Sequence, residues 1–101
     1  MYKILITTSD DINILEDIAK ECILHQKSSP CAHIINNVRS FYVWKDNYAK
    51  KSEYMLLIKC KEQYADNIKA LINDRHNYEI PELISIDFDI ASEKYKKWFI
   101  N

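Results

Sequence analysis

Side chains that could bind a cation gather in a loop near the end of the chain, where residues 76–82 read HNYEIPE. The loop histidine His76 and the carboxylate Glu82 could face a cleft between subunits, with Tyr78 beside them. Imidazole and carboxylate are both ligands of divalent metal ions. The alternative is structural: His76 would hydrogen-bond the loop, and Glu82 would form an ion pair with Lys59 or Arg39 that holds subunits together.

A second group of potential ligands lies earlier, where Cys22, His25, Cys31 and His33 form C-x-x-H followed by C-x-H. Four soft ligands fall within a dozen residues, but the spacing matches no standard zinc pattern. Cys22 also has a place on the apolar face of an amphipathic helix. The group is therefore either a metal site or a set of core thiols and surface imidazoles.

Charged residues on the predicted strands offer no catalytic arrangement. Glu53 and Lys59 share one strand face but lie six residues apart, so each would meet a partner from a second subunit, in an ion pair or at a ligand. Asp87 and Asp89 alternate with apolar residues and are typical of a solvated strand face. No Ser-His-Asp or Cys-His nucleophile order is present. The absence of glycine excludes the P-loop, the dinucleotide fingerprint and the G-x-S-x-G turn, so we expect no enzyme.

The elements that must position these residues follow from hydrophobic periodicity. A polar insert, residues 45–52, separates two aromatic-rich strands, with Asp46 and Asn47 as the residues that best tolerate the turn. Ser9 or Asp10 is the expected cap of the first helix, and Ser92 that of the last. The predicted strands cover residues 2–8, 31–44, 53–60 and 83–90, and the predicted helices cover about 11–26, 62–73 and the segment after 92.

This order predicts an α+β fold, a ferredoxin-like βαββαβ sandwich with a long β-hairpin and a short C-terminal helix. Two helices would cover one face of a four-stranded antiparallel sheet, and the strand over 83–90 would be half-buried near an edge. The other face would expose more apolar area than monomers usually do, so self-association is expected. The residues expected on that face are Tyr42, Trp44, Tyr54, Leu56 and Ile58.

Composition limits the function further. The 101 residues suffice for one domain, 1–101, and the 48% apolar and 29% charged shares are those of a globular protein. A net charge of -1 gives no basic field for nucleic acid. Apolar runs are too short for a membrane span, and no signal peptide is evident, so we expect a cytoplasmic protein. Three cysteines are an odd number, which indicates reduced thiols.

Motifs along the whole chain resemble the CutA divalent-cation-tolerance family. The matching segments are Cys31, Ser40–Trp44, Glu53–Lys59, His76–Glu82 and Tyr95–Trp98. The resemblance implies a homotrimer in which the long hairpin reaches a neighbouring subunit, and a role in tolerance of copper and other divalent cations. It implies Cu or Zn as the cation, with Cys31 at the family's cysteine position beside His76 and Glu82. Two positions that hold family copper ligands carry Thr7 and Arg75 in this chain.

Two functions follow as hypotheses. The first is a metal-responsive homotrimer with His76, Glu82 and Cys31 as metal contacts. The second is a trimer similar to the PII signalling proteins, whose intersubunit cleft near Lys59, Arg39 and Glu82 takes a small anionic metabolite or a loop of a partner protein. The residues expected at the cleft or interface are Arg39, Tyr42, Trp44, Glu53, Lys59, Tyr78, Tyr95 and Trp98.

Overall fold

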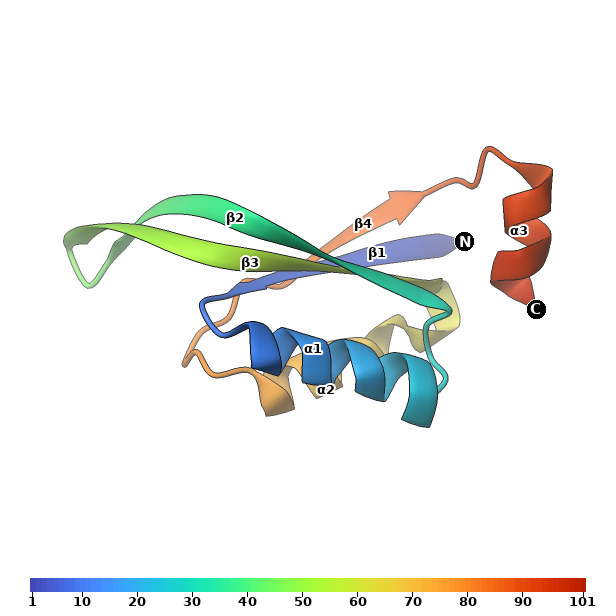
Figure 1. The fold of residues 1–101 in the computed structure, drawn as a ribbon, viewed down its shortest axis with the longest axis horizontal. Helices are drawn as coiled ribbons and strands as arrows, with labels where there is room; N and C mark the ends of the chain where they lie inside the picture. The colour runs from blue at the N-terminus through green and yellow to red at the C-terminus, as the bar shows by residue number, and fades with distance from the viewer.

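One antiparallel sheet of four strands forms the centre of the protein, and two of the helices lie on the same face of it (Figure 1). The computed structural model describes residues 1–101. The elements, in chain order, are β1 (Tyr2–Ser9), α1 (Ile12–Lys20) with a π-helical extension (Glu21–His25), β2 (Cys31–Trp44), β3 (Asn47–Lys61), a 3-10 turn (Glu62–Tyr64), α2 (Ala65–Arg75), β4 (Ile84–Phe88) and α3 (Glu93–Ile100). The strands follow the order β2-β3-β1-β4, which confirms the predicted βαββαβ arrangement with a terminal helix.

The core lies between the sheet and helices α1 and α2. Its fully buried members come from both layers: Leu5, Leu15, Ile18, Leu56, Ile58, Ile68 and Ile72. Tyr54, Leu56 and Ile58 were expected on the sheet face opposite the helices, and that prediction is wrong. Leu56 and Ile58 are 0% exposed beneath the helices, and Tyr54 packs against the same core. The cap of α1 is also one residue later than predicted, since the Asp11 side chain accepts from the Asn13 N–H at 2.9 Å.

The hairpin of β2 and β3 turns over only two residues. Lys45 and Asp46 both have positive φ, 49° and 65°, which is the geometry of the two-residue turns that match strand twist. Asn47 already belongs to β3 and pairs with Trp44. The predicted insert over 45–52 is therefore wrong beyond Asp46, and the strands continue almost to the tip (Figure 1).

A β-bulge in β2 changes which face its side chains occupy. Ile35 pairs with Met55 and Val38 pairs with Glu53. Between these two pairs β2 contains two residues and β3 contains one, so β2 has one extra residue. Asn37 has a φ of 60° within the bulge. Because side chains alternate along a strand, the extra residue moves Tyr42 and Trp44, with the other even-numbered residues beyond the bulge, to the sheet face opposite the helices.

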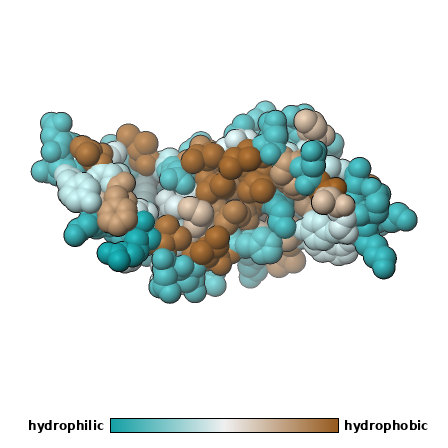
Figure 2. All heavy atoms as spheres, turned by 90° about the horizontal axis from the view of Figure 1, so that it is seen from above, coloured by the Kyte–Doolittle hydropathy of each residue, from teal (hydrophilic) through white to brown (hydrophobic).

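That uncovered face is apolar. We call it the open face, and its central residues are Ile4, Ile6, Ile35, Met55, Leu57, Ile84 and Ile86. Ile84 and Ile86 are 45% and 46% exposed, and Figure 2 shows a broad hydrophobic area over the middle of this side. β4 is an edge strand, as predicted. Its apolar side chains are not buried within one subunit, because they point away from the helices.

Helix α3 lies at the end of the sheet away from the hairpin (Figure 1). Ser92 caps it as predicted, accepting from the Tyr95 N–H at 3.2 Å. Phe99 is 2% exposed and meets the rings of Tyr2 and Phe88 edge-on, which anchors the helix. Trp98 remains 55% exposed. None of the three helices has the length and apolar character of a transmembrane segment.

Candidate functional site

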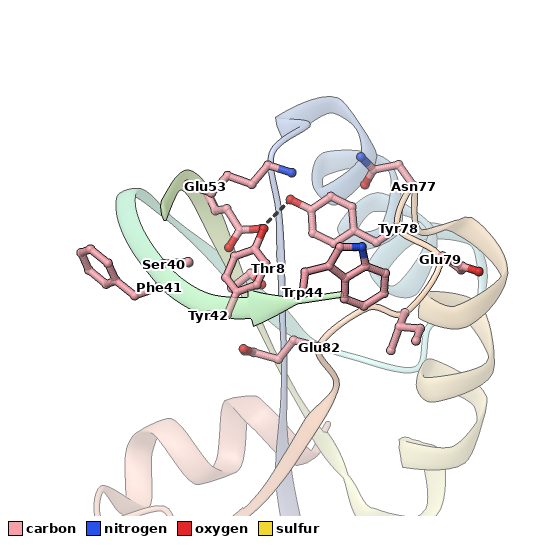
Figure 3. A pocket seen from close by; sticks show the side chains of 12 residues that line it. Thr8, Ser40, Phe41, Tyr42, Trp44, Glu53, Asn77, Tyr78, Glu79 and Glu82 are labelled. Carbon is pink, nitrogen blue, oxygen red and sulfur yellow. Dashed lines mark hydrogen bonds between the residues drawn. The ribbon is translucent and has the colours of Figure 1, made fainter. Parts of the chain in front are cut away.

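A pocket lies where the base of the hairpin meets the loop after α2 (Figure 3). Its volume is about 540 Å³. We call it the hairpin pocket. Its lining comes from the end of β1, from β2 and β3, and from the loop: Thr8, Ser40, Phe41, Tyr42, Trp44, Lys51, Glu53, Asn77, Tyr78, Glu79, Ile80 and Glu82. The structure thus brings together five predicted residues of the cleft and loop, Tyr42, Trp44, Glu53, Tyr78 and Glu82.

The floor of the hairpin pocket is a pair formed by Glu53 and Tyr78. Glu53 is 5% exposed, and its Oε2 accepts a hydrogen bond of 2.5 Å from the Tyr78 hydroxyl. The same hydroxyl oxygen accepts from the Asp10 N–H at 2.9 Å. Burial, together with the Glu53 carboxylate, raises the pKa of Tyr78 to about 12. The hydroxyl therefore keeps its proton at neutral pH and donates it to Glu53.

Lys51, the one cation in the lining, already has partners. Its Nζ lies 2.8 Å from Asp10 Oδ2 and 4.6 Å from the centre of the Tyr78 ring. The hydrogen bond to Asp10 raises the pKa of Lys51 well above its ordinary value. Glu79 and Glu82 remain as exposed carboxylates. The unneutralised charge of the hairpin pocket is therefore negative.

His76 is held by the backbone through both ring nitrogens. Nδ1 accepts from the Tyr78 N–H at 3.0 Å, so Nε2 carries the proton and donates to the Thr8 carbonyl at 2.8 Å. Its ring also packs against Tyr78, with centroids 4.9 Å apart. A metal ion could reach His76 only if one of these hydrogen bonds broke. The structure thus shows the loop-fixing contacts that the structural alternative required.

A second cluster surrounds Cys31 at the opposite end of the sheet. Cys31 Sγ lies 3.4 Å from His33 Nε2 and accepts a long hydrogen bond of 3.8 Å from the Tyr95 hydroxyl. Lys59, directly opposite Cys31 in the sheet, donates to the Tyr95 oxygen at 2.9 Å. That hydrogen bond, with a smaller contribution from the Cys31 sulfur, raises the pKa of Lys59. We call these four residues the Cys31 cluster.

The three predicted metal contacts do not meet within one chain. Glu53 of the hairpin pocket and Lys59 of the Cys31 cluster are six residues apart on β3, about 20 Å at the rise of a strand. No group of three or more His, Cys, Asp or Glu side chains is arranged to hold a metal ion. His76 and Glu82 therefore lie near one end of the sheet, and Cys31 lies at the other.

The set Cys22, His25, Cys31 and His33 is also divided. Cys22 is 0% exposed in the core, and burial raises the pKa of its thiol to about 11. His25 pairs with Glu21, with 3.2 Å between Nδ1 and Oε2. Only Cys31 and His33 remain together. All three cysteines are free, which agrees with the expectation of reduced thiols.

Arg39 lies apart from Lys59 and Glu82, the two other residues of the predicted anion cleft. It lines a small hollow of about 120 Å³ with Lys50 and Lys51, whereas Lys59 belongs to the Cys31 cluster and Glu82 to the hairpin pocket. Sequence reasoning also missed the roles of Asp10 and Lys51. These two residues are 41 positions apart along the chain, and no local pattern indicates that they meet.

Comparison with known proteins places this geometry in context. The family model described as "CutA1 divalent ion tolerance protein" matches residues 3–101. The divalent-cation tolerance protein CutA of Pyrococcus horikoshii is 31% identical over 97 residues, 96% of this chain and 93% of that protein. The chloroplastic protein CutA of Arabidopsis thaliana is 29% identical over 79 residues, 78% of this chain but only 43% of its own length. The chain thus spans less than half of that plant relative.

Solved structures show the same fold. The CutA1 of the psychrotrophic bacterium Shewanella sp. SIB1 superposes with a TM-score of 0.89 at 28% identity, covering 98% of this chain and 92% of that one. A protein of Archaeoglobus fulgidus described as the periplasmic divalent cation tolerance protein CutA also gives 0.89, at 20% identity, covering 99% and 96%. Because relatives are described as chloroplastic or periplasmic, the cytoplasmic location stays a prediction.

Proposed function

The chain belongs to the CutA1 divalent ion tolerance protein family, and from that membership we propose that it is a homotrimeric divalent-cation tolerance protein that binds copper or zinc at Cys31. A divalent ion tolerance family is not an enzyme class, which agrees with the expectation of no enzymatic activity. The observation that carries the metal proposal is the contact between Cys31 and His33.

The geometry of that contact suits a metal ion. Zn–S and Zn–N bonds at a tetrahedral angle separate sulfur from nitrogen by about 3.6 Å, and Cys31 Sγ lies 3.4 Å from His33 Nε2. Thiolate and imidazole are ligands that copper and zinc both accept. Cys31 and His33 would occupy two coordination positions of the metal ion, and water or a neighbouring subunit would occupy the others.

The proposal retains Cys31 from the predicted metal contacts and replaces His76 by His33. His76 would have to give up a hydrogen bond to the Thr8 carbonyl or from the Tyr78 N–H. Glu82 lies near His76, at the other end of the sheet. His33, in contrast, is exposed and its Nε2 faces only the sulfur. Glu82 then lines the hairpin pocket, and His76 fixes the loop that carries Tyr78. Neither residue belongs to the metal site.

The open face supports the proposed homotrimer. Ile35, Ile84 and Ile86 are each close to half exposed on it, and the area they belong to is continuous (Figure 2). A contiguous apolar surface of this kind is typical of an interface. Three copies of a 12.0 kDa chain would give a species of about 36 kDa in light scattering. A stable 12 kDa species at micromolar concentration would contradict the proposal.

Calorimetry with Zn²⁺, under conditions that keep the thiols reduced, tests the metal site. We expect one site per chain in the wild type, and loss of that site in Cys31→Ser and in His33→Ala. His25→Gln is the matched control, because His25 is an exposed histidine outside the Cys31 cluster. An unchanged isotherm in Cys31→Ser, with the fold intact by circular dichroism, would contradict the assignment.

A second candidate function is a trimer similar to the PII proteins that binds a small anion. The hollow lined by Arg39, Lys50 and Lys51 favours it, because Arg39 and Lys50 border a volume of about 120 Å³, while Lys51 is already paired with Asp10. A thermal-shift screen distinguishes the two candidates. Stabilisation by Zn²⁺ or Cu²⁺ supports the metal function, whereas stabilisation only by organic acids or nucleotides, lost in Arg39→Gln, supports the anion site.

A further inference from the structure

We propose that Tyr95 is a positioning residue of the metal site, because its hydroxyl donates a hydrogen bond to the Cys31 sulfur, and that Lys59 acts through Tyr95 by fixing the direction of that hydroxyl. The inference rests on the proposed metal function and deepens it, since neither residue is itself a metal ligand. The contacts that carry it lie within one chain, between α3, β2 and β3. They do not depend on which surfaces the trimer covers.

The direction of the Tyr95 hydroxyl follows from its two polar neighbours. Lys59 Nζ lies 2.9 Å from the Tyr95 oxygen, and an ammonium group has N–H donors but no acceptor. The oxygen therefore accepts from Lys59, and the single hydroxyl proton must go to another atom. Cys31 Sγ is that atom, at 3.8 Å from the oxygen. The sulfur thus receives a donor whose orientation is set by a third side chain.

The ring of Tyr95 is held in place by α3 and by its aromatic neighbours. Its centroid lies 5.6 Å from that of Trp98, in a stacked arrangement, and 6.0 Å from that of Phe99. At the start of the helix, the Ser92 hydroxyl accepts from the Tyr95 N–H. Phe99, which is 2% exposed, already anchors α3 against the sheet. The Tyr95 hydroxyl is therefore not needed to hold the helix, and its contact with sulfur calls for another role.

The backbone on both sides of this contact is fixed as well. Cys31 and Lys59 are direct partners in the sheet. Ser29, which is 4% exposed, joins them, because its Oγ donates to the Lys59 carbonyl at 2.6 Å and accepts from the Cys31 N–H at 3.1 Å. A ligand is held precisely when the groups around it are themselves locked by packing and hydrogen bonds. The Cys31 cluster has this support on β2, β3 and α3.

A hydrogen bond to the sulfur affects the metal site in two ways. It limits rotation of the Cys31 side chain, which keeps Sγ 3.4 Å from His33 Nε2. It also withdraws negative charge from the sulfur, and hydrogen bonds around a cysteine sulfur tune the electronic properties of the metal that it binds. Replacing groups that orient metal ligands usually lowers metal affinity about 10–100-fold. We therefore expect the Tyr95 hydroxyl to affect both the affinity and the spectrum of a bound metal ion.

Co²⁺ is the probe, because it accepts the same nitrogen and sulfur ligands as Zn²⁺ and absorbs light by charge transfer from a bound thiolate. Spectra of the wild type are recorded under reducing conditions, and Cys31→Ser identifies the band that arises from this sulfur. We expect Tyr95→Phe to move that band to longer wavelength, because a sulfur without the hydrogen bond gives up an electron more easily. The same variant should weaken Co²⁺ binding about tenfold. Tyr2→Phe is the matched control, since it removes a hydroxyl from the aromatic cluster that anchors α3 without touching the sulfur.

A double-mutant cycle tests the role of Lys59. Lys59→Met should shift the band in the same direction as Tyr95→Phe but by less, because the hydroxyl remains and only its orientation is free. Lys59→Arg, which again places a donor near the Tyr95 oxygen, should return the band toward its wild-type position. In the Tyr95→Phe background, Lys59→Met should add little. A full additional shift there would show that Lys59 acts on the sulfur through its charge alone, and would overturn its assigned role.

The outcomes separate this inference from the metal site on which it rests. A band that Cys31→Ser removes and that Tyr95→Phe leaves at its wild-type wavelength would overturn the inference and retain the metal site. The absence of any band in the wild type would remove the metal site and this inference together. Circular dichroism of each variant checks the fold, and Tyr95→Phe should leave it unchanged because the ring and its contacts with Trp98 and Phe99 remain.

Discussion

Replacing Tyr78 by phenylalanine tests whether the Glu53–Tyr78 pair holds the hairpin against the body of the protein. The substitution keeps the ring that Lys51 and His76 contact and removes only the hydroxyl. That hydroxyl donates to Glu53 and accepts from the Asp10 N–H. Tyr78 lies in the loop after α2 and Glu53 on β3, so the bond joins segments that are 25 residues apart.

The magnitude follows from the two hydrogen bonds. A hydrogen bond to a charged group contributes about 1.5–3 kcal/mol, and Glu53 at 5% exposure has little water to replace the lost donor. The Asp10 N–H is exposed and can bond to solvent instead, so it adds little. We expect Tyr78→Phe to lower the free energy of unfolding by about 2 kcal/mol. In a double-mutant cycle with Glu53→Gln, the two losses should not add.

Urea unfolding of both proteins at the same concentration measures this loss, because the dependence of stability on protein concentration is then the same condition for each. A loss below about 0.5 kcal/mol, the range of ordinary surface substitutions, would refute the argument that Glu53 depends on Tyr78. The pH dependence gives a second measurement. The pKa of Tyr78 is raised from about 10 to about 12 in the folded protein, so its contribution is complete below pH 10 and is lost as the pH rises toward 12. The difference in stability between wild type and Tyr78→Phe should shrink over that interval.

Three further predictions concern the core, the thiols and the bulge. Thr7→Val should raise the free energy of unfolding by about 1 kcal/mol, because Thr7 Oγ1 is buried without a partner; an equal or lower stability in urea would contradict this. In the folded protein Cys31 should react with a thiol reagent before Cys22 and Cys60, whose pKa values burial raises to about 11; bound Zn²⁺ should slow Cys31 alone. Asn37→Gly should be tolerated, whereas Asn37→Val should cost about 1–2 kcal/mol, because a branched residue opposes the positive φ; equal urea midpoints for these two variants would argue against the bulge geometry.

Much of the fold could be predicted because its signals are local. The amphipathic spacing of Leu15, Ile18 and Cys22 identifies the buried face of the first helix, and all three are fully buried. Ser92 followed by an acidic residue marks the start of α3, and the cap is present. Each of these features depends on residues within one or two helical turns, where propensity and capping act directly.

The faces of the hairpin could not be predicted in the same way. Alternation alone places Tyr42 and Trp44 with Leu56 and Ile58, and the structure separates the two pairs because of one extra residue at Asn37. A bulge shifts the phase of everything beyond it, and an asparagine in a polar stretch carries no unique signal for one. The assignment of the open face was therefore wrong for Tyr54, Leu56 and Ile58.

The same shift explains why the hairpin pocket escaped prediction although five of its twelve lining residues were singled out. With Tyr42 and Trp44 turned toward the Glu53 side, three rings and a buried carboxylate border one volume, and the loop that carries Tyr78 closes it. Each residue alone is compatible with an interface or with a loop contact. Their combination depends on the bulge and on hydrogen bonds between segments far apart in the chain, such as Ser9 to Asn77. The arrangement of this site therefore follows from non-local geometry, and a variant that removes the bulge should separate Tyr42 and Trp44 from Glu53 even though every lining residue remains.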